Sequence, residues 1–157
     1  MKSTGVFALG LVAVIGAGCV TQDDPVEAFL GAWSVTGGTV TVACDSGSRV
    51  DTLEGKVTFE RGSTSDLVLV LDDASCSLRL DVSGTSASLQ PDQTCTENTT
   101  RGRVEIAWKM WDLDISDDHH GGWKGSLNAN VKSTVFDSGL TYGCTTTETA
   151  TLTKLTR

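Results

Sequence analysis

The sequence predicts an all-β domain: an antiparallel, roughly eight-stranded up-and-down β-barrel, with a β-sandwich as the alternative. From Gly31 onward, nearly every segment alternates apolar and polar residues with a period of two and is rich in Thr, Val and Ser. Short turn signals such as Ser83-Gly84 and Asp137-Ser138-Gly139 separate these segments. Hairpins that follow one another in series favour the barrel, because pairing of the first and last strands leaves no free edge.

The expected elements follow one another along the chain. Val26–Leu30 is apolar and long enough for one helical turn, and Gly37-Gly38 is expected to be the turn of the first hairpin. The expected strands are Trp33–Thr36, Thr39–Cys44, Gly55–Glu60, Asp66–Leu71, Ser75–Val82, Thr85–Gln90, Arg103–Ile115, Trp123–Val135 and Leu140–Leu155.

Alternate residues of a strand face opposite sides of a sheet, so the pattern also predicts which side is buried. The last strand carries a row of threonines on one parity, with Cys144, Ala150 and Leu152 on the other. Each strand is therefore expected to have one solvent-facing and one buried side. In Arg103–Ile115 the apolar parity changes, which predicts a bulge near Trp111-Asp112. The residues on its first apolar parity are Val104, Ile106, Trp108 and Met110, and those on its second are Leu113 and Ile115.

The first 18 residues have the pattern of a secretory signal peptide. Lys2 supplies a positive start, Val6–Ile15 is a nearly continuous apolar run, and Gly16-Ala17-Gly18 forms a small-residue cleavage site. The apolar run is too short to span a bilayer as a stable helix. We therefore expect residues 1–18 to be removed on export.

The cleavage site resembles the lipobox of bacterial lipoproteins, in which small residues precede a lipidated cysteine. Ala17-Gly18-Cys19 matches that pattern, whereas Gly16 stands where the family favours Leu. The resemblance implies lipidation of Cys19 and a lipidated tether over residues 19–27, which leaves residues 28–157 for the β-barrel domain that the strand pattern predicts. It also implies a cell-envelope protein whose partner is a lipid bilayer. Val20 follows the cysteine where Asp retains some lipoproteins in the inner membrane, which favours the outer membrane, facing the periplasm or the surface. Cleavage after Gly18 by an ordinary signal peptidase is the alternative.

The other four cysteines predict two disulfides in an exported domain. Barrel closure brings the end of the first hairpin to the start of the last strand, which favours a Cys44–Cys144 bridge. Cys76 and Cys95 flank the hairpin at Gly84 and would pair across it. Cys44 with Cys76 and Cys95 with Cys144 is the alternative pairing, which suits a sandwich better.

The start of the domain resembles the lipocalins and the wider calycin group. Gly31-Ala32-Trp33, preceded by Ala28-Phe29-Leu30, looks like the G-x-W signature that opens their first strand. The resemblance implies that Trp33 closes one end of a barrel and that a late basic residue, Lys154 or Arg157, packs across its indole. It also implies a small apolar ligand. The second lipocalin motif, a T-D-Y-like turn, has no counterpart in the chain.

Composition and motifs exclude several function classes. All 20 acidic residues and all but one of the 12 basic residues follow position 18, so the mature chain has a net charge near −9 and disfavours a nucleic-acid partner. No nucleophile elbow, zinc-protease motif or phosphate-binding loop is present, which predicts neither an enzyme nor a cofactor. His119 and His120 follow Asp117-Asp118 and are weak candidates for metal ligands; a solvated polar turn is the alternative.

Three tryptophans are candidate ligand-binding residues. Trp108, Trp111 and Trp123 lie close to one hairpin, where aromatic rings at a barrel mouth could stack on a ligand; filling the barrel is the alternative role. The expected function is an envelope lipoprotein that binds a small apolar ligand in a lipocalin-like barrel. The alternative is a structural or protein-interaction lipoprotein, with no cavity and with an exposed apolar patch around Trp111.

Overall fold

The structure, a computed structural model, describes residues 24–71, 76–100, 102–137 and 139–155. The expected signal peptide, residues 1–18, and Cys19 lie outside this range. In the described residues no helix is both long and apolar enough to cross a membrane. The elements are a 3-10 turn η1 (Pro25–Ala28) and the strands β1 (Gly31–Cys44), β2 (Gly47–Thr52), β3 (Gly55–Arg61), β4 (Leu67–Leu71), β5 (Ser77–Ser83), β6 (Ser86–Leu89), β7 (Thr94–Thr99), β8 (Gly102–Asp117), β9 (Trp123–Asp137) and β10 (Leu140–Lys154).

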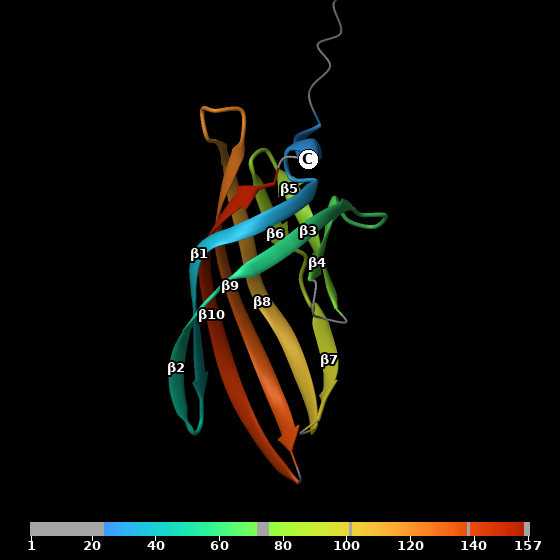
Figure 1. The fold of residues 1–157 in the computed structure, drawn as a ribbon. Coiled ribbons are helices and arrows are strands. Elements are labelled where there is room, and N and C mark those ends of the chain that lie inside the picture. Colours follow the sequence, from blue (N-terminus) through green and yellow to red (C-terminus); the bar gives the residue numbers. More distant parts are fainter. Residues whose placement is uncertain (1–23, 72–75, 101, 138, 156–157) are drawn as a thin grey trace, which may run out of the picture.

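Eight of these strands form a closed, antiparallel, hydrogen-bonded ring (Figure 1). Its order is β1-β3-β4-β5-β6-β8-β9-β10, and β10 pairs with β1 to close it. The predicted all-β class, antiparallel pairing and closure of the sheet are therefore confirmed. Closure removes the free edges that a flat sheet of this size would expose to other chains.

The ring is complete over only part of its height, because two long strands change partners midway. β1 pairs with β3 through Gly31–Val35 and with β2 through Thr39–Cys44. β8 pairs with β6 through residues 112–114 and with β7 through residues 102–107. Each change of partner coincides with a break in register, between Val35 and Gly37 in β1 and between Trp108 and Met110 in β8. Such bulges bend a strand and increase its twist, which lets it leave one neighbour for another.

The two parts of the molecule therefore differ. The packed half contains the core and consists of η1, β3, β4, β5, β6 and the adjoining segments 31–35, 111–117, 123–129 and 150–154. The open half is a curved six-stranded sheet in the order β2-β1-β10-β9-β8-β7, built from β2, β7 and segments 39–44, 102–108, 131–137 and 140–148. In Figure 1 the open half extends away from η1.

Two details of the strand prediction are wrong. Gly37-Gly38 is not a hairpin turn: β1 runs straight through it, and a Cβ at Gly38 would lie 2.8 Å from the Ala150 Cβ. These glycines let β1 bulge against β10. The bulge in β8 also comes earlier than predicted, so Met110 faces outward, 39% exposed, and Trp111 faces inward, 2% exposed.

The core fills the packed half with apolar side chains. Trp33 is fully buried, and its ring lies edge-on to Phe59 at 6.2 Å between centroids. Phe59 in turn contacts Trp111 at 5.9 Å. The fully buried members of largest volume are Trp33, Phe29, Phe59, Leu67, Leu69, Leu78, Leu80, Leu113 and Leu152.

Trp33 and Lys154 meet at the end of the packed half, as expected from the Gly31-Ala32-Trp33 sequence. The Trp33 Nε1 donates to the Phe29 carbonyl at 2.8 Å, and the Lys154 Nζ lies 5.9 Å from the centre of the Trp33 ring. That ammonium also donates to the Ala28 carbonyl at 2.8 Å. Of the two basic residues expected to cross the indole, Lys154 does so, and Arg157 lies outside the described residues.

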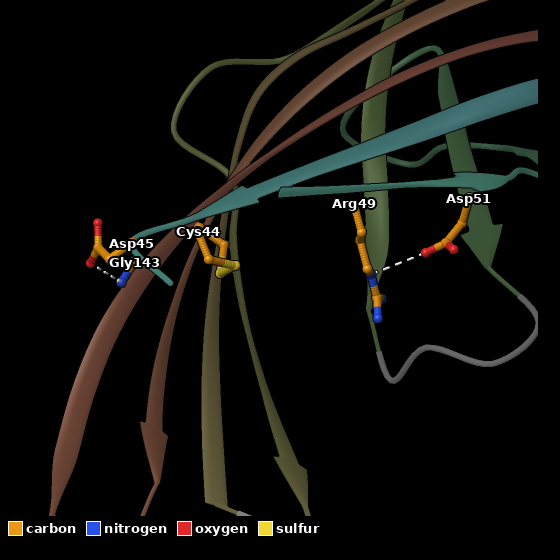
Figure 2. Close-up of a disulfide and its surroundings, with 6 residues drawn as sticks. Cys44, Asp45, Arg49, Asp51 and Gly143 are labelled. Carbon is orange, nitrogen blue, oxygen red and sulfur yellow. Dashed lines mark hydrogen bonds and ion pairs between the residues drawn. A yellow bond between two sulfur atoms is a disulfide. The ribbon is translucent and has the colours of Figure 1, made fainter. Parts of the chain in front are cut away.

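The predicted disulfide pairs are both present, and the alternative pairing is wrong. Cys44 and Cys144 face each other across β1 and β10 with their Cα atoms 4.1 Å apart, and Cys76 joins Cys95. Figure 2 shows the first bridge beside the Asp45 carboxylate, which accepts a hydrogen bond from the Gly143 amide at 3.3 Å. The Cys44–Cys144 bridge therefore lies at the closure of the ring, within the open half.

A buried glutamine supports the junction between the two halves. Gln93 precedes β7, and its side-chain amide accepts from the Arg79 N–H at 2.7 Å and donates to the Arg79 carbonyl at 2.8 Å. These two bonds reproduce the exchange that a paired strand would make with β5. The Gln93 carbonyl also accepts from the Trp108 amide at 3.0 Å, which joins the start of β7 to β8.

Candidate ligand-binding face

The three candidate tryptophans do not share a site. Trp111 is part of the core in the packed half. Trp123 is half-buried and lines a cleft at the end of the packed half, whereas Trp108 lies on the concave side of the open half and packs against the core only in part. The β8 bulge places Trp108 and Trp111 on the same, inner side of the sheet, so they are separated by their positions along β8 and not by opposite parities.

The concave side of the open half is mostly apolar and only half-covered. The cross-strand register places residues of β1, β10, β9 and β8 in successive rows that face the same side. One row runs Val42, Thr146, Val131 and Trp108, and the next runs Cys44, Cys144, Ser133 and Ile106. All of these residues are buried or half-buried, although nothing in the described chain closes the face as β3, β4, β5 and β6 close the packed half.

A cleft of about 480 Å³ lies on this face. Ligand pockets for small molecules begin at about 300 Å³, so its size is sufficient. The interior of the packed half, in contrast, is occupied by its own side chains. The lining residues of the cleft are Val42, Cys44, Ser46, Gly47, Ser48, Arg49, Ser133, Val135 and Cys144.

Trp108 contributes an unsatisfied polar group to the concave side. Its Nε1 is buried and has no acceptor among the described residues. A buried donor without a partner costs about 1–3 kcal/mol of stability, so proteins rarely keep one. The indole N–H is a donor only, and a ligand that satisfies it must offer an acceptor.

Glu148 is the other polar group on this side, and it is half-buried. It lies on β10 between Val40 of β1 and Ala129 of β9, and it forms no hydrogen bond or ion pair with the described residues. Burial raises the pKa of its carboxyl group above the ordinary value, because the charged form loses solvation.

The remaining charged groups of the concave side lie on its edge strands. On β2, Arg49 and Asp51 form an ion pair at 3.0 Å, visible in Figure 2, and both side chains are largely exposed. Glu97 lies on the other edge strand, β7, opposite Val104. Among these groups only Glu148 combines burial with the lack of a partner.

The second cleft, of about 750 Å³, lies at the opposite end of the molecule. Its charged member, Lys154, is already engaged with the Trp33 ring and the backbone of η1. The described lining of this cleft therefore contains no unpaired polar group comparable to the Trp108 indole N–H or the Glu148 carboxyl. Its lining residues are Leu30, Gly31, Ala32, Thr58, Gly121, Gly122, Trp123, Lys154 and Leu155.

His119 and His120 belong to an exposed turn between β8 and β9. The Asp117 and Asp118 carboxylates accept hydrogen bonds from the His119 and His120 amides, each at 2.8 Å. The bonds from the His120 and Gly122 amides lower the pKa of Asp118. These carboxylates thus stabilise the turn, and the described residues contain no group of three or more ligands that could hold a metal.

The described residues form no exposed apolar patch around Trp111, which is itself buried. Val50 and Met110 are exposed, but they lie at opposite ends of one cross-strand row. The residues between them, Thr41, Thr147 and Asn130, are polar. The other exposed large apolar residues are Leu140, at the start of β10, and Leu155, after its end.

No protein-family model, curated protein or solved structure matches the chain. What the structure shows is an antiparallel sheet that closes in a ring of eight strands, with Lys154 lying over Trp33 at one end.

Proposed function

We propose that this protein is a lipid-anchored protein of the cell envelope that binds a small, mainly apolar ligand on the concave side of its open half. The observation that carries the proposal is the cleft of about 480 Å³ on that side. It differs from the expected lipocalin site in position, because the ligand lies beyond the packed interior of the ring and not within it.

The chemistry of the face supports a ligand with an apolar body and at least one oxygen or nitrogen acceptor. Valine and isoleucine side chains in the rows described above gain from being covered, at about 25 cal/mol per Å² of apolar surface removed from water. The Trp108 Nε1 would donate to the acceptor of the ligand, which would remove the cost of an unpaired buried donor.

We place the lipid anchor at Cys19. The orientation of the domain relative to the membrane follows from that position. Asp24, the first described residue, caps η1 at the end of the packed half. Figure 1 shows that the open half extends from the other end. A bilayer-anchored chain would therefore present its ligand face away from the membrane, and Val20 favours the outer membrane.

Ligand binding is tested with the full chain carrying Cys19→Ser, which removes the need for detergent. The probe is N-phenyl-1-naphthylamine, whose fluorescence rises on transfer to an apolar site. Val42→Asn places a polar amide in the lining of the cleft, and we expect it to weaken binding at least about tenfold.

The matched control is Val50→Asn, on the neighbouring strand but 66% exposed on the outer side, and we expect it to change the affinity less than about twofold. Equal losses in the two variants, or no binding by the parent chain, would contradict the proposed ligand site.

The anchor is tested by intact-mass spectrometry of the wild-type protein from the membrane fraction. We expect a chain that begins at Cys19 and carries two or three acyl groups, and a Cys19→Ala chain that leaves the membrane. A cleaved wild-type chain with an unmodified Cys19 thiol would rule out lipidation.

A further inference from the structure

The carboxyl group of Glu148 lies on the concave side among neighbours that carry no positive charge. Its neighbours in the cross-strand row are Val40 and Ala129, and one row away lie Thr146 and Val131, none of which can neutralise a charge. A carboxylate that loses water without gaining a cation is strongly disfavoured in an apolar setting. The concave side therefore favours a positive charge beside Glu148.

The protein's own cations do not meet that demand. Arg49, on the same side, is paired with Asp51 at 3.0 Å on an exposed edge strand. The inward rows of β1, β8 and β9 contain no basic residue over the described segments that flank Glu148. The net charge of −8 for the whole chain adds a field that attracts cations to the surface.

Trp108 fixes where the second polar group of a ligand must lie. Glu148 and Trp108 lie on strands that β9 separates, one row apart, because Glu148 pairs with Ala129 and Trp108 pairs with Val131. Strand spacing and rise put their Cα atoms about 12 Å apart. Both residues face the same side of the sheet, so a headgroup that lies across β9 would extend from the acid to the indole N–H.

We infer, building on the proposed function, that the ligand is an amphiphile with an alkyl chain and a headgroup in which a protonated amine neighbours an oxygen, as in an alkyl amino alcohol. Glu148 pairs with the amine, the Trp108 Nε1 donates to the oxygen, and the valine and isoleucine rows cover the chain. An ammonium supplies up to three donors and a full charge, which matches a carboxylate better than any neutral group does.

The test compares three ligands with the same chain length on the Cys19→Ser protein, by titration calorimetry at pH 7 below their micelle concentrations. These are 2-aminododecan-1-ol, dodecan-1-ol and dodecanoate. We expect the amino alcohol to bind at least about tenfold more tightly than the alcohol, and dodecanoate to bind most weakly.

Glu148→Gln separates the specific pair from general attraction to an acidic protein. We expect this variant to bind the amino alcohol no better than the alcohol, while its circular dichroism spectrum matches that of the parent chain, which shows that the fold is intact. The control is Glu105→Gln, which also removes one negative charge but lies on the outer side of β8, where Glu105 pairs with Arg103 at 2.7 Å. It should keep the preference for the amino alcohol.

Two results would overturn the inference while leaving the proposed function in place. One is tight binding of dodecan-1-ol or dodecanoate that equals binding of the amino alcohol, and the other is a preference for the amine that survives Glu148→Gln. If none of the three ligands and no neutral probe binds, the proposed function itself fails.

Discussion

The packed half and the open half share four strands, β1, β8, β9 and β10, yet they are stabilised differently. In the packed half these strands and β3, β4, β5 and β6 enclose a core of fully buried side chains. In the open half they form one curved sheet whose concave side is half-covered and whose closure is reinforced by Cys44–Cys144. The comparison teaches that two bulges, in β1 and β8, are enough to divide one sheet into a scaffold and a binding surface.

Loss of the ring-closing disulfide should have the largest effect on this division. Cys44–Cys144 closes a loop of 100 residues and Cys76–Cys95 closes one of 19. The chain-entropy account assigns about 4.7 kcal/mol to the longer loop and about 3 kcal/mol to the shorter one. We expect paired Cys→Ser replacement at 44 and 144 to lower the free energy of unfolding more than replacement at 76 and 95, as measured by urea denaturation. The reverse order would show that the open half does not depend on its bridge.

A matched pair of tryptophan substitutions should have the next largest effect. Trp33→Phe removes the hydrogen bond to Phe29 and leaves space in a filled core, so we expect a loss of about 1–3 kcal/mol. Trp108→Phe removes a donor that has no acceptor, so we expect little loss or a small gain. Chemical denaturation of both variants gives the comparison, and equal losses would mean that the concave side is packed as tightly as the core.

The pH dependence of stability should give the smallest of the three effects. The raised pKa of Glu148 means that the folded chain keeps a proton that the unfolded chain has already released, so the free energy of unfolding falls as the pH rises from the ordinary glutamate pKa through the raised one. Arg49, Asp51 and Glu97 are the other charged groups on this side, all on edge strands. We expect Glu148→Gln to flatten that part of the curve, measured by urea denaturation between about pH 4 and pH 7. An unchanged curve would exclude Glu148 as its source.

The sequence predicted the fold class, the buried parity of most strands and both disulfide pairs, because each depends on strong local alternation and on ring closure. It missed β2 and β7. Every residue of β2 is exposed and β7 is mostly polar, so neither shows the alternation that indicates a strand. β2 pairs with the second half of β1, and β7 pairs with the first half of β8.

The candidate site was less predictable for the same reason. The sequence predicted that tryptophans bind an apolar ligand, but one extra residue in β8 decides whether Trp108 and Trp111 face the same side of the sheet. Glu148 gave no signal in the sequence, since it reads as one more polar residue in a threonine-rich strand. Its role becomes visible only when the register places it opposite Val40 and Ala129.

β2 and β7 lie outside the ring, and their exposed edges affect how the protein can associate with other molecules in solution. No strand in the described chain pairs with the outer edge of either one, so each exposes backbone donors and acceptors that a second molecule could use to extend the sheet. Both edges carry charge, through Arg49 and Asp51 on one and Glu97 on the other. Charged side chains on an edge strand oppose the addition of a further strand, so these residues disfavour self-assembly through the two exposed edges.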